Sequence, residues 1–249
     1  MLLSLLAVAA AGAAAGVSNA LAGAGSLITF PTLIAVGVPP LAANVTSTVG
    51  LVPGAAGGAI GYVDLVREQS ERLRRLTVPT LAGAAIGTVA LLLTSNQTFE
   101  AIVPILVAGS CLLLLFQPQL TPRIAHAGNE HSPFLTAGLF LSGAYAAYFG
   151  SAVGILLLGL LGLFVAESMQ HLNAIKIILG GLANLLATVV YAFLAPVHWE
   201  YALCLAVASL IGGRLGANLA RRVSGDTLRV AIAILGLLVA AVLAVRTYA

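Results

Sequence analysis

Long apolar stretches separated by short polar ones run through this chain of 249 residues. A helix needs about 20 apolar residues to cross the hydrocarbon core of a bilayer. Stretches of roughly this length or longer lie at approximately 2–36, 41–63, 76–94, 99–116, 134–164, 169–195, 198–220 and 226–245. The pattern predicts an all-α integral membrane protein with about eight apolar segments.

Two of these segments, 2–36 and 134–164, are too long for a single span even when it is tilted. Glycines interrupt each near its middle: Gly23 and Gly25 in the first, Gly150 and Gly154 in the second. Glycine weakens a helix interior and permits turns. We therefore expect two broken helices that enter the membrane and turn back.

The two halves of the chain resemble one another. The stretch GVSNALAGAGSLITFP (16–31) recurs as GAYAAYFGSAVGILLL (143–158), and GAAIG (83–87) recurs as GGRLG (212–216). The identities are few, but the segments follow in the same order. We predict a first transmembrane repeat at 1–118, a linker loop at 119–132 and a second transmembrane repeat at 133–249.

The basic residues test this topology, because cytoplasmic loops are enriched in Lys and Arg. Most lie between apolar segments two and three, four and five, or seven and eight: Arg67, Arg72, Arg74, Arg75, Arg123, Arg221 and Arg222. If the first and fifth segments turn back, each half crosses three times and all three loops face the cytoplasm. Inverted repeats are a common transporter plan, and we expect a multi-pass protein of the cell (plasma) membrane.

Composition agrees with a membrane protein, since 60% of the residues are hydrophobic and only 8% are charged. The net charge of +3 belongs to the loops, and no basic stripe with interleaved aromatic residues indicates nucleic acid. Cys111 and Cys204 lie in apolar runs and are interpreted as small buried residues. The Ala-rich beginning is interpreted as retained structure. Neither a metal cluster, a cofactor motif nor a hydrolase motif is found, which argues against an enzyme.

Lys176 is the only lysine, and it lies eight residues into a long apolar segment. A charge at membrane depth is costly and usually faces a cavity or a partner. Helical spacing places Asn173, Lys176, Gly180 and Asn184 on one face, without a carboxylate. This arrangement suits an incoming anion. The alternative is a lysine that pairs with an acid of another helix or extends to the interface.

Further candidates surround the glycine-rich breaks and the helix that follows the first one. Unwound backbone near Gly25 and Gly150 would expose N–H groups, and Ser26 and Ser151 would add hydroxyl donors. Thr46 and Ser47 lie near the start of the second apolar segment, at the place that corresponds to Asn173 and Lys176 in the sixth. Close helix packing and ordinary capping are the alternatives.

Three charged or titratable side chains could have a function in transport or could simply lie at the membrane surface. Glu167 and His171 could relay a proton, or they lie at the interface. Arg214 could be a second anion ligand, or it extends to the cytoplasmic surface.

At these residues the chain resembles the sulfite exporter TauE/SafE family, also called the toluenesulfonate uptake permease family. GAGSLITFP (23–31) with Thr46-Ser47 is similar to the family's Gly-rich motif and Thr-Ser pair, and NAIKIILGGLAN (173–184) to its Asn-x-x-Lys helix. The triple glycine of the family is reduced in both halves. The resemblance implies transport of sulfite, organosulfonates or related sulfur oxyanions and small carboxylates.

The expected function is secondary transport of a small anion by alternating access. The expected site comprises Lys176, Asn173, Asn184, Thr46, Ser47, Gly25, Ser26, Gly150 and Ser151. A passive anion channel and a membrane scaffold without cargo are the competing hypotheses. Besides the anion and the lipid bilayer, a coupling proton or cation and a second copy of the chain are open as partners.

Overall fold

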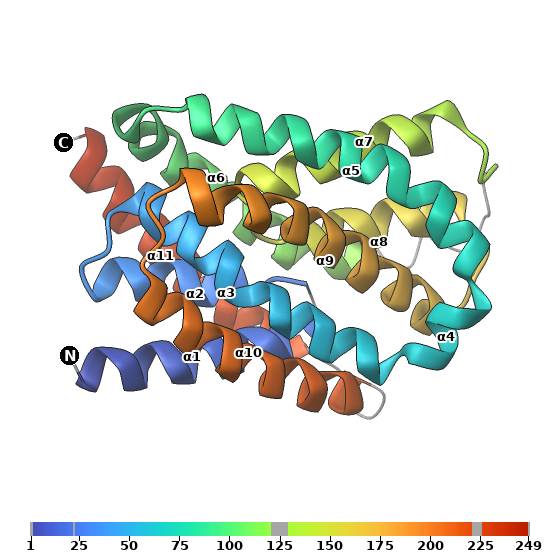
Figure 1. The fold of residues 1–249 in the computed structure, drawn as a ribbon, viewed down its shortest axis with the longest axis horizontal. Coiled ribbons are helices and arrows are strands. Elements are labelled where there is room, and N and C mark those ends of the chain that lie inside the picture. Colours follow the sequence, from blue (N-terminus) through green and yellow to red (C-terminus); the bar gives the residue numbers. More distant parts are fainter. Residues whose placement is uncertain (1, 22, 121–128, 221–225, 249) are drawn as a thin grey trace.

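The computed structural model describes residues 2–21, 23–120, 129–220 and 226–248, and their regular secondary structure is entirely α-helical. The helices run roughly lengthwise through the molecule (Figure 1). In chain order they are α1 (Leu2–Leu21), α2 (Ser26–Ala35), α3 (Pro40–Gly61), α4 (Val63–Glu68), α5 (Ser70–Leu93), α6 (Asn96–Leu120), α7 (Pro133–Tyr148), α8 (Val153–Phe164), α9 (Met169–Leu194), α10 (Trp199–Ala220) and α11 (Asp226–Tyr248).

Local sequence explains several helix starts. Pro40 and Pro133 each occupy the first position of a helix, where the missing N–H costs nothing. Ser132 caps α7 and Ser168 caps α9 by accepting a backbone N–H with the side-chain hydroxyl. The last cap fixes the first turn of α9, the helix that carries Lys176.

Within the part of the chain that the structure describes in full, five helices are long and apolar enough to cross a membrane: α1, α5, α6, α9 and α10. Their outer faces carry large apolar side chains, and Leu93 and Phe193 are 81% and 84% exposed. Such surfaces are unfavourable in water and favourable in lipid. The prediction of an α-helical integral membrane protein is confirmed.

Each of the two overlong apolar segments is a pair of helices. The first forms α1 and α2, with non-helical residues at 23–25, and the second forms α7 and α8, with a break at 149–152. The first helix of each pair packs against a helix from the other half of the sequence: α1 lies against α10, and α7 lies against α5. The long helices α3 and α9 contact each other, and α6 pairs with α11. Both chain termini lie at one end of the molecule and α4 lies at the other (Figure 1).

Small residues make the close contacts of α1 and α7 possible. Gly83 and Gly87 of α5 lie against the backbone of α7 at Phe140 and Ala144, with no room for a Cβ atom. Gly212 and Gly216 of α10 lie in the same way against the backbone of α1, at Ala13 and Val17. This is the small-residue packing by which helices approach closely in membranes. The Gly-x-x-x-Gly motifs at 83–87 and 212–216 therefore each allow two helices to pack closely, α5 on α7 and α10 on α1.

Candidate functional site

The two helix breaks begin with the same backbone geometry. Gly23 and Gly150 adopt φ of +74° and +71°, a left-handed conformation that glycine adopts without strain. The N–H of Gly23 donates to the carbonyl of Ser18, and that of Gly150 donates to the carbonyl of Tyr145, both at 2.9 Å. This bond closes a helix C-terminus, so α1 and α7 end in the same way.

The breaks meet in the middle of the molecule. A Cβ atom on Gly23 would lie 2.5 Å from the Cα of Gly154, so side chains larger than glycine are excluded at this crossing. Beside it, the hydroxyl of Ser26 donates to the hydroxyl of Ser151 at 3.1 Å. The chain thus turns twice at one place, once from each half.

A cavity of about 60 Å³ lies between these breaks and the helices α3 and α9. Since one water molecule needs about 10–15 Å³ measured this way, the cavity has room for about four waters. Small side chains and a few polar ones line it: Asn19, Ala20, Gly23, Ser26, Thr48, Leu51, Gly54, Ala55, Gly58, Phe149, Gly150, Val153, Gly154, Lys176, Ile177, Gly180, Gly181 and Asn184.

Lys176 is the charged residue among the lining side chains, and it is only 3% exposed. Its Nζ donates to the carbonyl oxygen of Asn19 over 3.5 Å, at the outer limit of a hydrogen bond. None of the acidic side chains that the structure describes forms an ion pair with it. A buried ammonium without a counter-ion is costly, and an anion in the cavity would relieve that cost.

Two helix N-termini add positive potential at the same place. The helix α2 begins at Ser26 and α8 begins at Val153, and both residues line the cavity. The N-terminus of a helix carries a partial positive charge and favours anions. The Oδ1 atom of Asn184 has no hydrogen-bond partner among the described residues, so this amide can turn to present its NH₂ group.

Four of the nine residues predicted from the sequence line the cavity: Lys176, Asn184, Ser26 and Gly150. Ser151 lies next to the lining and accepts the hydrogen bond of Ser26. The N–H of Gly25 donates to the side-chain oxygen of Asn19 at 2.7 Å.

The remaining three predicted residues make contacts outside the lining, between segments that lie far apart in the sequence or on different helices. The hydroxyl of Thr46 accepts from the backbone N–H of His198 at 3.0 Å, and Ser47 shares a hydrogen bond of 2.6 Å with Thr29. The amide of Asn173 donates to the carbonyl of Ala20 at 3.1 Å.

The structure adds Thr48 and Asn19 to the lining. Helical spacing contained a signal for Thr48, because Thr48, Leu51, Ala55 and Gly58 recur at three- and four-residue intervals on one face of α3. Asn19 lies just before the first break, and this position in the sequence already allowed its side chain to line the cavity.

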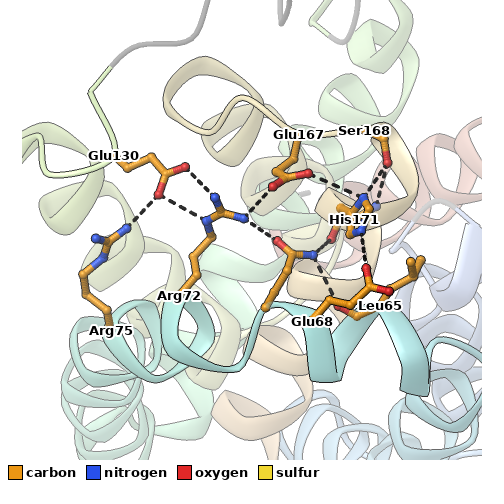
Figure 2. Close-up of polar contacts among 9 residues, drawn as sticks. Leu65, Glu68, Arg72, Arg75, Glu130, Glu167, Ser168 and His171 are labelled. Atoms are coloured by element: carbon orange, nitrogen blue, oxygen red, sulfur yellow. Dashed lines mark hydrogen bonds and ion pairs between the residues drawn. The ribbon is translucent and has the colours of Figure 1, made fainter.

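A network of ion pairs and hydrogen bonds joins α4 and α5 to the linker and to the start of α9, as Figure 2 shows. The Arg72 guanidinium donates to Glu130 at 2.8 and 3.1 Å and to Glu167 at 2.9 Å. The His171 ring lies 3.1 Å from Glu68. The predicted pair of Glu167 and His171 is thus part of a contact between the two halves of the sequence.

Electrostatics favour the ionised form of Glu130 within this network. Burial raises the pKa of the Glu130 carboxyl, but hydrogen bonds from Arg72 and Arg75 and their positive charges outweigh burial, so its pKa lies below the usual 4.5. The network lies beyond the cavity, near the end of α3 and the beginning of α9. Arg214 is exposed on α10 and is not part of the cavity lining.

Comparison with known proteins supports a transport role. The family profile described as Sulfite exporter TauE/SafE matches residues 8–243. A "Probable membrane transporter protein" of Haemophilus influenzae is 24% identical over 211 residues, which cover 81% of this chain and 79% of the relative. "Probable membrane transporter protein ORF9" of Sinorhizobium sp. is 24% identical over 210 residues, with 83% and 79% covered.

A third relative, "Probable membrane transporter protein YfcA" of Escherichia coli strain K12, is 24% identical over 211 residues, with 82% of this chain and 76% of the relative covered. The family profile extends over both breaks and the cavity-lining residues. The resemblance noted in the sequence is confirmed: the chain belongs to the sulfite exporter TauE/SafE family of membrane transporters.

Proposed function

We propose that the protein is a secondary transporter that moves a small anion across the cell membrane by alternating access. The observation that carries the proposal is the buried ammonium of Lys176, which lies in the central cavity and pairs with none of the carboxylates that the structure describes. Composition, apolar helices and family membership support a multi-pass membrane transporter rather than an enzyme.

The size and polarity of the cavity favour a compact oxyanion. Room for about four waters matches sulfite, a pyramidal anion of four heavy atoms, and it also suits other small sulfur oxyanions and carboxylates. Lys176 would supply charge, while Ser26, Thr48 and Asn184 would supply hydrogen bonds. The positive ends of α2 and α8 would face the same anion. The name of the family agrees with sulfite as a substrate.

Equivalent contacts support two inverted repeats at 1–118 and 133–249, joined by the loop 119–132. Gly23 and Gly150, 127 positions apart, terminate α1 and α7 with the same hydrogen bond. Gly83 and Gly212, 129 positions apart, pack on the backbone of α7 and α1 respectively. Each half therefore holds the broken helix of the other, which is the arrangement expected of inverted repeats.

Two groups of side chains would serve as the barriers between the cavity and the ends of the molecule that alternating access requires. Towards one end lies the ion-pair network around Arg72. Towards the end where α6 begins lies an aromatic cluster, in which Phe149 contacts Phe30 edge-on at 5.5 Å and Phe99 at 6.4 Å between ring centres. In the proposed cycle, one barrier opens while the other stays closed. A pH gradient or a cation gradient would bias which barrier opens.

Transport in proteoliposomes tests the proposal. The purified protein is expected to take up radiolabelled sulfite with saturation, and unlabelled sulfite inside the vesicles should accelerate uptake of the label outside. Flux that saturates without this acceleration would favour a passive anion channel, and no flux with any small oxyanion or carboxylate would favour a scaffold. The same vesicles with and without a pH gradient reveal coupling to protons.

A further inference from the structure

Two asparagines make the same contact in the two halves of the chain. Asn44 of α3 donates from its side-chain nitrogen to the carbonyl of Tyr148, at the end of α7, over 2.9 Å. Asn173 of α9 donates in the same way to the carbonyl of Ala20, at the end of α1, over 3.1 Å. The two asparagines are 129 positions apart.

These carbonyl groups need a donor, because the last carbonyls of a helix have no partner within the helix. The breaks prevent α1 and α7 from continuing, and the following chain turns away. Each asparagine therefore satisfies the carbonyl end of the broken helix that belongs to the other half. A second hydrogen bond, from the Asn173 amide to the Tyr62 hydroxyl at 2.9 Å, holds its NH₂ group in this orientation.

The two places differ one helical turn further on. After Asn44 this turn brings Ser47, whose hydroxyl is engaged with Thr29. After Asn173 it brings Lys176, whose ammonium lies 3.5 Å from the carbonyl of Asn19, the residue before Ala20. The carbonyl end of α1 thus faces an amide and an ammonium side by side. A helix C-terminus attracts cations, so it competes with an incoming anion for the lysine.

We propose that Asn173 is a positioning residue that keeps Lys176 available to the transported anion; this rests on the proposed function. By donating to the Ala20 carbonyl, Asn173 removes one acceptor that the ammonium would otherwise bind, and it fixes the end of α1 at a distance that leaves Lys176 only one long hydrogen bond. Asn44 only satisfies the end of α7, because the residue one turn after it is the uncharged Ser47. Asn173, which the sequence predicts to bind the anion directly, thus acts on the anion through Lys176.

The chain provides a matched control for the test. Asn173→Ala and Asn44→Ala each remove one interhelical hydrogen bond to a helix end, and each is expected to lower the midpoint of thermal unfolding by about 2–4 °C. Binding of sulfite to the purified protein is then measured by calorimetry. Asn173→Ala should weaken sulfite binding about five- to tenfold, the fold-change to which one hydrogen bond corresponds. Asn44→Ala should leave the Kd within about twofold.

The outcomes separate this inference from the proposed function. If wild-type protein binds sulfite and Asn173→Ala binds it equally well, or if both variants lose the same affinity, the positioning role is wrong although the transporter proposal stands. If wild-type protein binds neither sulfite nor thiosulfate, methanesulfonate or acetate, both fail. Should an alanine variant not fold, Asn173→Ser and Asn44→Ser are compared instead. A serine hydroxyl bonds within its own helix, and the same difference in Kd is expected.

Discussion

Replacing Lys176 with methionine should make the protein more stable and unable to bind its anion. The ammonium is almost fully buried, and its hydrogen bond to the carbonyl of Asn19 is long. The effective cost of burying an ion is several kcal/mol, only partly recovered here by the helix end and by water in the cavity. Methionine has a similar length and no charge. We expect Lys176→Met to raise the free energy of unfolding by about 1–3 kcal/mol, and each kcal/mol to raise the midpoint by about 2–4 °C.

The loss of anion affinity follows from the same geometry. A hydrogen bond to a charged group contributes about 1.5–3 kcal/mol, and two unit charges about 4 Å apart attract by about 4 kcal/mol at an effective dielectric constant near 20. Since about 1.4 kcal/mol is tenfold, affinity should fall at least about a hundredfold. Thermal unfolding in detergent, with and without sulfite, measures both effects. Arg214→Met, which removes an exposed charge from α10, should change neither. A Lys176→Met variant that is less stable and still stabilised by sulfite would refute the reasoning.

Three further predictions concern the packing, the cavity and the ion-pair network. Gly83→Ala places a Cβ atom against the backbone of α7 and should destabilise the fold by about 1–3 kcal/mol in thermal unfolding, whereas Gly109→Ala, with open space around it, should not. The new Cβ atom of Gly180→Ala would lie 3.7 Å from its nearest neighbouring atom, so this variant should fold normally. Because the added methyl group reduces a cavity of about 60 Å³, calorimetry should show that methanesulfonate binding weakens more than sulfite binding. The folded-state pKa of Glu130 lies below 4.5. Its contribution to stability is therefore complete above that value and is lost as the pH falls through the folded-state pKa. Glu130→Gln should make the midpoint of thermal unfolding fall less steeply in acid.

Much of the architecture could be predicted from the hydrophobic pattern. The overlong segments and their glycines indicated where α1 and α7 end, because a helix cannot use so many apolar residues in one crossing. Lys176 was identifiable because a charge within an apolar run requires a reason. Both arguments depend on local sequence, which is why they could be made without coordinates.

The partners of the polar side chains could not be predicted in this way. Thr46 lies near Thr48 in the sequence, yet a rotation of about 100° per residue around the helix axis directs it to the backbone N–H of His198. Asn173 shares a helix face with Lys176, but it lies one turn earlier and donates to the carbonyl of Ala20 outside the cavity lining. The network of Arg72, Glu130 and Glu167 joins residues far apart in the sequence, and spacing says nothing about such pairs. These contacts depend on how helices from the two halves of the sequence pack against each other.

The most direct test of the account is to locate a bound anion. Selenite has the shape and charge of sulfite, and its selenium atom gives an anomalous diffraction signal. Crystals of the protein grown with selenite should show a single strong peak in the central cavity, within hydrogen-bond distance of Lys176 Nζ through the selenite oxygens and absent in Lys176→Met. A peak at the guanidinium groups of Arg72 and Arg75 instead, or an unchanged peak in the variant, would contradict the account.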